Sequence, residues 1–306
     1  MDDTKTTPAG AAAVRHALDL LGHGRAAEAE GELAALADAP WESDPEATRL
    51  RAQVLDGLGR TRFALGDREG GLAALRAAVD TLAAATGARL PQAGAARAGG
   101  DAGAALVPLR CRALQNLCFA LAETGAVEES AAVGEEAARL AEALFGPQSP
   151  ELAGALLRLS SAPYRARDLD AAEALIRRAR DIWEAQPGPT PQEVGTCLNN
   201  LGRIHEERGD MAAGIAFHRQ AVAFRRTLPD REDLAFSLGN LGVALAQDGQ
   251  WRAACAALEE ALELYAALGK GSGPEARGYA DNLAVCRRAL LAETAETTGD
   301  THEQQH

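Results

Sequence analysis

His205 and Glu206, in the stretch CLNNLGRIHEERGD, could begin the zinc-binding helix of a metalloprotease. That motif needs a second histidine four residues after the first, so that both imidazoles leave one helical face toward the same ion. Gly209 occupies the position, and no third ligand stands at a suitable spacing from His205 or His218. The sequence therefore does not support a metal site, and we expect both histidines to pack between helices.

Motifs for covalent or phosphate chemistry are also missing from the sequence. It contains no G-x-S-x-G elbow and no phosphate loop ending in Gly-Lys. Its pairs of acidic residues are interpreted as solvent-exposed positions of helices rather than as catalytic carboxylates. The glycine-rich stretch LGKGSGPE, residues 268–275, has no strand before it and is interpreted as a loop. We therefore expect no catalytic activity and no cofactor.

Length and composition favour a helical protein with a large core. The chain has 306 residues, of which 47% are hydrophobic and only 4% aromatic, and alanine is abundant throughout. Alanine favours closely packed helices, whereas sheets are rich in β-branched and aromatic residues. The predicted fold class is all-α.

The charge of the chain argues against two classes of partner. A formal net charge of −13 repels nucleic acid and anionic lipid. The N-terminus is acidic, and no apolar run approaches the length of a membrane span. The five cysteines never form a C-x-x-C motif, so we expect them all to be reduced. These features predict a cytoplasmic protein that binds neither nucleic acid nor membranes.

A repeat becomes visible when CLNNLGRIHEERGD is aligned with SLGNLGVALAQDGQ, residues 237–250, which superposes Gly202 on Gly242. The same helix position recurs along the whole chain, at Ala17, Gly59, Cys118, Ser160, Gly202, Gly242 and Ala284. Successive positions are 42, 59, 42, 42, 40 and 42 residues apart. The one long step matches an insertion rich in alanine and glycine, residues 87–106. A period of about 42 residues indicates a repeat protein.

Each repeat unit is predicted to form two helices. In the unit that contains Gly202, the first helix ends at the turn residues Arg208-Gly209-Asp210. The second helix then carries Gly214, His218 and Ala221 along one face. Small residues at such positions let paired helices approach closely, so each unit is interpreted as a helical hairpin.

This pattern resembles the tetratricopeptide repeat, and the spacing and Asn-Leu-Gly runs are most similar to the kinesin-light-chain variety. The resemblance covers residues 8–292 and implies a right-handed α-solenoid of about six helical hairpins and a C-terminal capping helix. Pro163 departs from the family pattern, because it occupies an aromatic position of the fourth repeat.

The predicted organisation follows from these repeats. We expect disordered ends at residues 1–8 and 294–306 and a solenoid over residues 9–293. The repeats are predicted near residues 9–40, 46–86, 107–146, 149–186, 190–228 and 231–269, with the cap at 274–293.

The resemblance implies that the first helix of each hairpin lines a concave binding groove. One first-helix position, two residues before the glycine position, holds asparagine in four units: Asn116, Asn200, Asn240 and Asn282. An amide offers a donor and an acceptor, so a row of them could bind the backbone of an extended peptide. Alternatively, the asparagines bond to neighbouring helices and hold adjacent repeats in register.

Arginines form a second group on the first helices. The candidates for peptide binding are Arg112, Arg158, Arg165 and Arg203, with Arg60 nearby in register. Guanidinium groups pair with carboxylates and phosphates in a bidentate manner, which favours an acidic ligand. The alternative is that they are solvated or paired within the molecule.

The predicted function is a non-catalytic adaptor or regulator that binds a protein or an extended peptide. Two alternatives are a bacterial regulator that senses a peptide by changing its curvature, and an accessory subunit of an enzyme complex. The composition, rich in alanine and arginine, is typical of bacteria. The sequence predicts neither the identity of the partner nor the oligomeric state.

Overall fold

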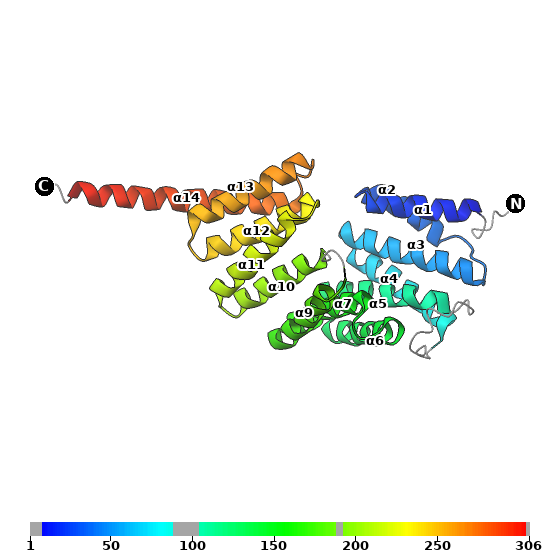
Figure 1. Cartoon of the computed structure of the whole chain (residues 1–306). Helices are drawn as coiled ribbons and strands as arrows, with labels where there is room; N and C mark the ends of the chain where they lie inside the picture. The colour runs from blue at the N-terminus through cyan, green and yellow to red at the C-terminus, as the bar shows by residue number, and fades with distance from the viewer. Residues whose placement is uncertain (1–7, 88–103, 188–191, 304–306) are drawn as a thin grey trace. The chain divides into compact units, whose positions relative to one another are not determined.

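The computed structural model describes residues 8–87, 104–187 and 192–303, and these residues form helices and turns without any strand (Figure 1). The all-α prediction is confirmed. Most of the predicted insertion, together with residues 1–7 and 304–306 of the predicted disordered ends, lies outside the described part. Among the helices described, none is both long and apolar enough to cross a membrane.

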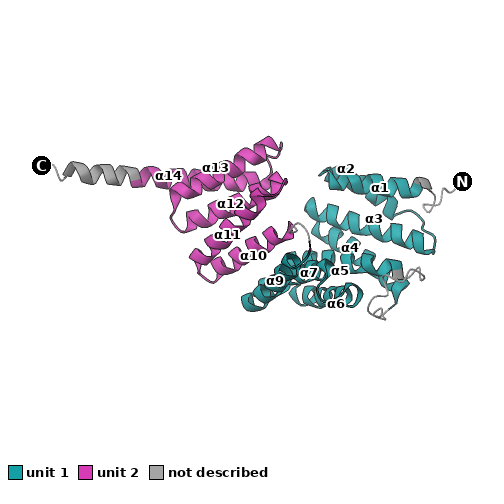
Figure 2. Ribbon diagram, in the orientation of Figure 1, with its two compact units in different colours: residues 1–186 teal, residues 187–306 magenta. Residues whose placement is uncertain are grey.

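The chain divides into two compact units, residues 1–186 (unit 1) and residues 187–306 (unit 2) (Figure 2). The helices of unit 1 are α1 (Pro8–Gly22), α2 (Ala26–Ala37), α3 (Pro45–Ala64), α4 (Arg68–Thr86), the 3₁₀ turn η2 (Ala104–Leu106), α5 (Val107–Glu123), α6 (Val127–Phe145), α7 (Pro150–Leu159), α8 (Ser161–Arg165) and α9 (Leu169–Glu184). Those of unit 2 are α10 (Glu193–Glu207), α11 (Met211–Arg226), α12 (Arg231–Gln247), α13 (Trp251–Ala267) and α14 (Pro274–Glu303). Within each unit, successive helices pack against one another as hairpins.

The turn inside each hairpin is set by a short local signal. Gly209 ends α10 with a φ of +81°, and the Asp210 side chain accepts a hydrogen bond of 3.1 Å from the backbone N–H of Ala213. Glycine tolerates this left-handed conformation without a steric penalty, and aspartate caps the exposed N–H groups of the next helix. In the fourth hairpin Arg167 adopts the same conformation, with a φ of +65°.

Close packing inside the hairpins depends on the small residues at the repeated glycine position. A Cβ atom at Gly59 would lie 2.6 Å from Leu75 of α4, and one at Gly242 would lie 2.6 Å from Leu258 of α13. Such distances are shorter than carbon atoms allow. The predicted close approach of paired helices is therefore present, with a large side chain of the second helix lying against a small residue of the first.

The first helix of the fourth hairpin is interrupted between α7 and α8. Ser160 lies at the break, and its hydroxyl donates a hydrogen bond of 2.7 Å to the carbonyl oxygen of Leu157. Pro163 lacks an N–H group for the carbonyl of Leu159, so the regular hydrogen-bond ladder cannot continue through this turn.

The last helix is longer than the predicted capping helix. The sequence predicts a cap over residues 274–293 followed by a disordered tail, whereas the backbone of α14 is helical as far as Glu303. Alanine and glutamate recur between residues 293 and 303 and no proline interrupts them, so helix propensity accounts for the extension. Leu283 and Cys286 bury the inner face of α14 against the core of unit 2.

Candidate binding site

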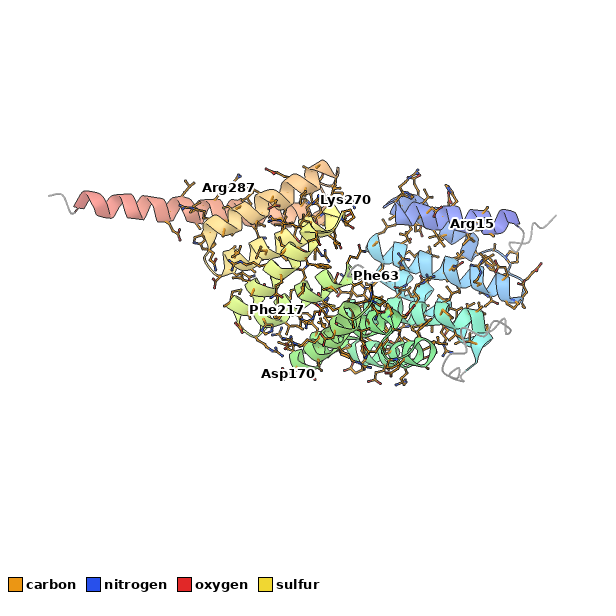
Figure 3. The ribbon with its side chains drawn as sticks, in the orientation of Figure 1. Arg15, Phe63, Asp170, Phe217, Lys270 and Arg287 are labelled. Atoms are coloured by element: carbon orange, nitrogen blue, oxygen red, sulfur yellow. The ribbon has the colours of Figure 1, made fainter. Side chains whose placement is uncertain are left out.

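A pocket of about 310 Å³ lies in unit 1, where the first helices of three successive hairpins meet α4. We call it the unit 1 pocket. Its lining residues come from α3, α4, α5 and α7: Arg60, Phe63, Ala64, Leu75, Asn116, Phe119, Ala120 and Arg158. Phe63 is labelled on α3 in Figure 3. The pocket brings together two residues that the sequence predicts as ligand-binding, Asn116 and Arg158.

Most of the pocket wall is apolar. Leu75 and Ala120 are buried, while Phe119 keeps 37% of its surface exposed. A large exposed aromatic ring beside a concave surface is typical of a binding site, because such a ring contributes much contact area when a ligand covers it.

Arg158 supplies an uncompensated positive charge to this pocket. Its guanidinium lies 5.1 Å from the ring centre of Phe119, a cation–π arrangement. Desolvation lowers the pKa of Arg158, and the neighbouring charge of Arg60 acts in the same direction. Among the residues that the structure describes, no carboxylate lies within ion-pair distance of Arg158.

Other arginines of unit 1 are neutralised by carboxylates. Such ion pairs join Arg62 to Glu30, Arg76 to Glu129, Arg110 to Glu136, Arg165 to Glu123 and Arg178 to Glu142. Arg165, a predicted ligand-binding residue, is thus already paired within the molecule, as the alternative interpretation of the arginines expects. Arg158 differs from these arginines because it faces the unit 1 pocket and has no carboxylate within ion-pair distance among the described residues.

Asp56 is a carboxylate that contacts two residues of the pocket lining, and the sequence analysis did not single it out. Only 6% of its surface is exposed. It accepts a hydrogen bond of 2.8 Å from the Asn116 side chain, and its other oxygen lies 3.9 Å from the Arg60 guanidinium. Burial raises the pKa of Asp56, although Asn116, Arg60 and Arg112 oppose this shift.

Arg112 is exposed and does not line the unit 1 pocket. It lines a much smaller cavity of about 10 Å³ on the other side of Asp56, together with Gln53 and several apolar residues. Arg112 therefore acts on the pocket through Asp56 rather than by contact with the pocket itself.

The four predicted asparagines do not form a uniform row. Asn116 donates to Asp56, Asn240 accepts a hydrogen bond of 3.2 Å from Tyr279, and Asn282 donates to the carbonyl of Gly278 in its own helix. Asn200 is half-buried, and none of the described residues hydrogen-bonds its side chain. Asn116 thus connects two hairpins and Asn240 connects α12 to the last helix α14, which favours the register-holding alternative at these positions.

Unit 2 contains a buried polar network that sequence reasoning missed. Asn199 donates a hydrogen bond of 2.9 Å to Ser237 of α12, and its carbonyl oxygen lies 3.1 Å from Nδ1 of His218. Nε2 of His218 lies 2.9 Å from Glu206. The network involves Asn199, which is the residue before the predicted Asn200. It therefore lies one residue away from the predicted row of asparagines. Arg203 is exposed on the same helix.

The described residues contain no group of histidine, cysteine or carboxylate side chains that could hold a metal ion. His205 stacks on Phe217 of α11 with ring centres 5.1 Å apart, and His218 is 1% exposed. Both histidines therefore pack between α10 and α11, as the sequence predicts.

Comparison with known proteins gives the class of this fold. The tetratricopeptide repeat family matches residues 151–227 and 193–267. The fold is similar to that of BtubC (BKLC) from P. vanneervenii, with a TM-score of 0.56 and 20% identity over 84% of this chain and 92% of that one. No match was found among curated proteins.

Two further solved structures share the fold. A putative kinesin light chain from Podosopora anserina has a TM-score of 0.53 and 18% identity over 74% of this chain and 99% of its own. The PH0952 protein from Pyrococcus horikoshii, a signal transduction ATPase with a tetratricopeptide repeat sensor, has a TM-score of 0.56 and 13% identity over 79% of this chain and 34% of its own.

Residues 151–267 thus match tetratricopeptide repeats, and the described residues form an all-α fold of helical hairpins similar to those of these solved structures. Tetratricopeptide repeats generally mediate interactions between proteins, and the fold is typically a non-catalytic scaffold.

Proposed function

We propose that this protein is a non-catalytic module that binds a protein or an extended peptide, and that the unit 1 pocket anchors an acidic group of that partner. The observation that carries the proposal is the Arg158 guanidinium, which lies in an apolar pocket without a carboxylate partner among the described residues. The Arg158 side chain is exposed, so an anionic group can reach its guanidinium and form charge-assisted hydrogen bonds with it.

The charge of the pocket supports an acidic partner. Arg60 and Arg158 line it, no carboxylate is part of its lining, and the buried Asp56 lies 3.9 Å from Arg60. The pocket thus carries a net positive charge in a chain whose formal net charge is −13. A guanidinium binds a carboxylate in two parallel hydrogen bonds, which gives orientation as well as affinity.

The size and wall of the pocket indicate what accompanies the acidic group. A volume of about 310 Å³ is at the lower end of the range for ligand sites. It suits one or two side chains rather than a long segment. Because Phe63, Phe119 and Leu75 form an apolar wall, an apolar side chain next to the acidic one fits best.

The asparagines have a narrower role in this proposal than a backbone-binding row. Asn116 lines the pocket and has one amide hydrogen committed to Asp56, so its carbonyl oxygen and second hydrogen remain for a ligand. Asn200 is the second candidate for a ligand contact, in unit 2. Asn240 and Asn282 are proposed to stabilise the hairpins.

A peptide array tests the proposal. The array would display acidic residues beside leucine, phenylalanine or alanine, and would be probed with the wild-type protein and with Arg158→Ala. We expect binding to the acidic and apolar sequences, and a loss of at least about tenfold in Arg158→Ala, because hydrogen bonds between charged groups contribute roughly 1.5–3 kcal/mol.

The matched control is Arg139→Ala. Arg139 is exposed on α6, where it pairs with Glu135 of the same helix, so this variant removes the same charge away from the pocket. Peptide binding that is equal in all three proteins, or that shows no preference for acidic residues, would contradict the proposal.

A peptide-sensing regulator is a second candidate, and one observation favours it. The pocket lining comes from three successive hairpins, so a ligand would contact all three at once and restrict their relative movement. The test is small-angle scattering with and without the tightest array peptide. A sensor should change its radius of gyration when the peptide binds, whereas a rigid adaptor should not.

A further inference from the structure

Asp56 is placed unusually for a charged residue of a helical repeat. It lies on α3, faces α5, and has only 6% of its surface exposed to solvent. A carboxylate at this depth is costly unless cations and hydrogen-bond donors compensate it. Two of its compensating groups, Asn116 and Arg60, also line the unit 1 pocket.

We propose that Asp56 is a resident counter-ion of the unit 1 pocket, which competes with the ligand for Arg60 and Asn116 and thereby limits the affinity for anions. This inference rests on the proposed binding function. When Asp56 is ionised, Arg60 is partly neutralised and the ligand gains less from it. When Asp56 takes up a proton, both Arg60 and Arg158 attract the ligand, so anion binding strengthens as the pH falls.

The groups around Asp56 are consistent with this role. Arg60 faces it from α3, and Arg112 and Asn116 face it from α5. The small cavity on its other side is lined by Arg112 and by uncharged residues, which are Leu82 of α4, Gln53, Ala52, Leu109 and Ala113. Among the described residues, Asp56 is therefore the acidic group whose protonation changes the charge at the pocket.

Two features make Asp56 suited to respond within an accessible pH range. Burial raises the pKa of Asp56, so it takes up a proton closer to neutral pH than an exposed aspartate does. Its hydrogen bond to Asn116 survives protonation of the other oxygen, since only one oxygen accepts from Asn116. The pocket wall can thus keep its shape while its charge changes.

The experiment uses N-acetylphenylalaninate, a single carboxylate on an apolar body, whose own carboxyl group is ionised above about pH 4.5. Binding to the full chain would be measured by NMR titration between pH 5 and pH 8. The variants are Asp56→Asn, which keeps the shape and the acceptor for Asn116, and Asp80→Asn, an exposed aspartate of α4 that makes the same change in net charge. Circular dichroism at each pH would confirm that all three proteins remain folded.

We expect Asp56→Asn to bind the probe about tenfold more tightly than wild type at pH 8. Removing one buried negative charge near the ligand changes its affinity by roughly a factor of ten. Wild type and Asp80→Asn should gain affinity as the pH falls, and Asp56→Asn should show less of that gain. If Asp56→Asn does not fold, the pH dependence of wild type alone still tests the proposal, because a flat profile contradicts it.

The outcomes separate the two proposals. Saturable binding by wild type, with the same affinity and pH profile in Asp56→Asn, would overturn the role of Asp56 and leave the binding pocket intact. No binding by any of the three proteins would overturn the pocket as an anion site, and the role of Asp56 with it.

Discussion

Units 1 and 2 are built from the same hairpin repeat, but Arg158 of unit 1 and the His218–Asn199 network of unit 2 differ in their partners. In unit 1, Arg158 faces a pocket and lacks a carboxylate partner among the described residues. In unit 2, His218 and Asn199 are buried and hydrogen-bonded to partners in three helices. The buried network of unit 2 holds its helices together, whereas Arg158 of unit 1 remains available to a ligand.

One repeat position shows how the difference arises. Asp56 and Asn199 both lie three residues before the repeated glycine position, occupied by Gly59 and Gly202. Asn199 is neutral and has two partners in neighbouring helices, so it closes a network. Asp56 is charged and draws Arg60 and Asn116 toward itself, so it shapes a cationic pocket. The repeat therefore determines the fold, while the residue at each position determines how the surface is used.

The largest expected effect comes from breaking the network of unit 2. His218→Ala removes a side chain that is 1% exposed and leaves Asn199 and Glu206 without their partner. We expect the free energy of unfolding to fall by about 3 kcal/mol, measured by denaturant titration.

The exposed His16→Ala serves as the control for this change and should alter stability by less than about 0.5 kcal/mol. Binding of the array peptide at low temperature should be unchanged in His218→Ala, because the pocket lies in unit 1. A loss of peptide binding in a protein that is still folded would show that the division of roles between the units is wrong.

A smaller effect is expected from the pH dependence of stability at Asp56. Because the pKa of Asp56 is higher in the folded than in the unfolded state, the folded protein binds more protons between these two values. Wild type therefore loses stability as the pH rises from about 3.8, the unfolded value, through the folded pKa. At pH 7 we expect Asp56→Asn to be more stable than wild type by about 1 kcal/mol.

Thermal unfolding between pH 4 and pH 7 would measure this difference. The gain of Asp56→Asn over wild type should shrink toward the acidic end. A gain that is constant with pH, or a variant that is less stable at pH 7, would show that the Asp56 carboxylate stabilises the folded chain.

The smallest expected effect concerns the turn of the fourth hairpin. Arg167 has a φ of +65°, where the other described hairpin turns carry glycine, as at Gly209. A non-glycine residue in this conformation costs roughly 1 kcal/mol. We expect Arg167→Gly to raise the free energy of unfolding by about 0.5 kcal/mol, since glycine also adds entropy to the unfolded chain. A decrease in the free energy of unfolding would indicate that the Arg167 side chain stabilises the fold by more than its backbone strain costs.

Much of the fold could be predicted from the sequence, because the repeat is a local signal. Leucine and glycine at helical spacing, and the Gly-Asp turns, determine each hairpin from residues close in the chain. The break at Ser160 is also local, but the sequence analysis placed Pro163 in the first helix without predicting an interruption.

The candidate site could be predicted only in part. The first-helix register correctly placed Asn116 and Arg158 on one surface, since both lie two residues before the glycine position. It could not show that Asn116 bonds to Asp56, 60 residues earlier, or that Arg165 pairs with Glu123, because such contacts depend on how hairpins stack. Nor does residue type alone show that Asn199, rather than Asn200, faces the buried network.

The most direct test of the central claim is arginine footprinting of the wild-type protein with phenylglyoxal, with and without the tightest peptide of the array. Mass spectrometry would report the modification of Arg158 and Arg60, with Arg139 as the exposed reference. We expect the peptide to protect Arg158 and Arg60 from modification and to leave the modification of Arg139 unchanged. Bound peptide together with undiminished modification of Arg158 would contradict this expectation.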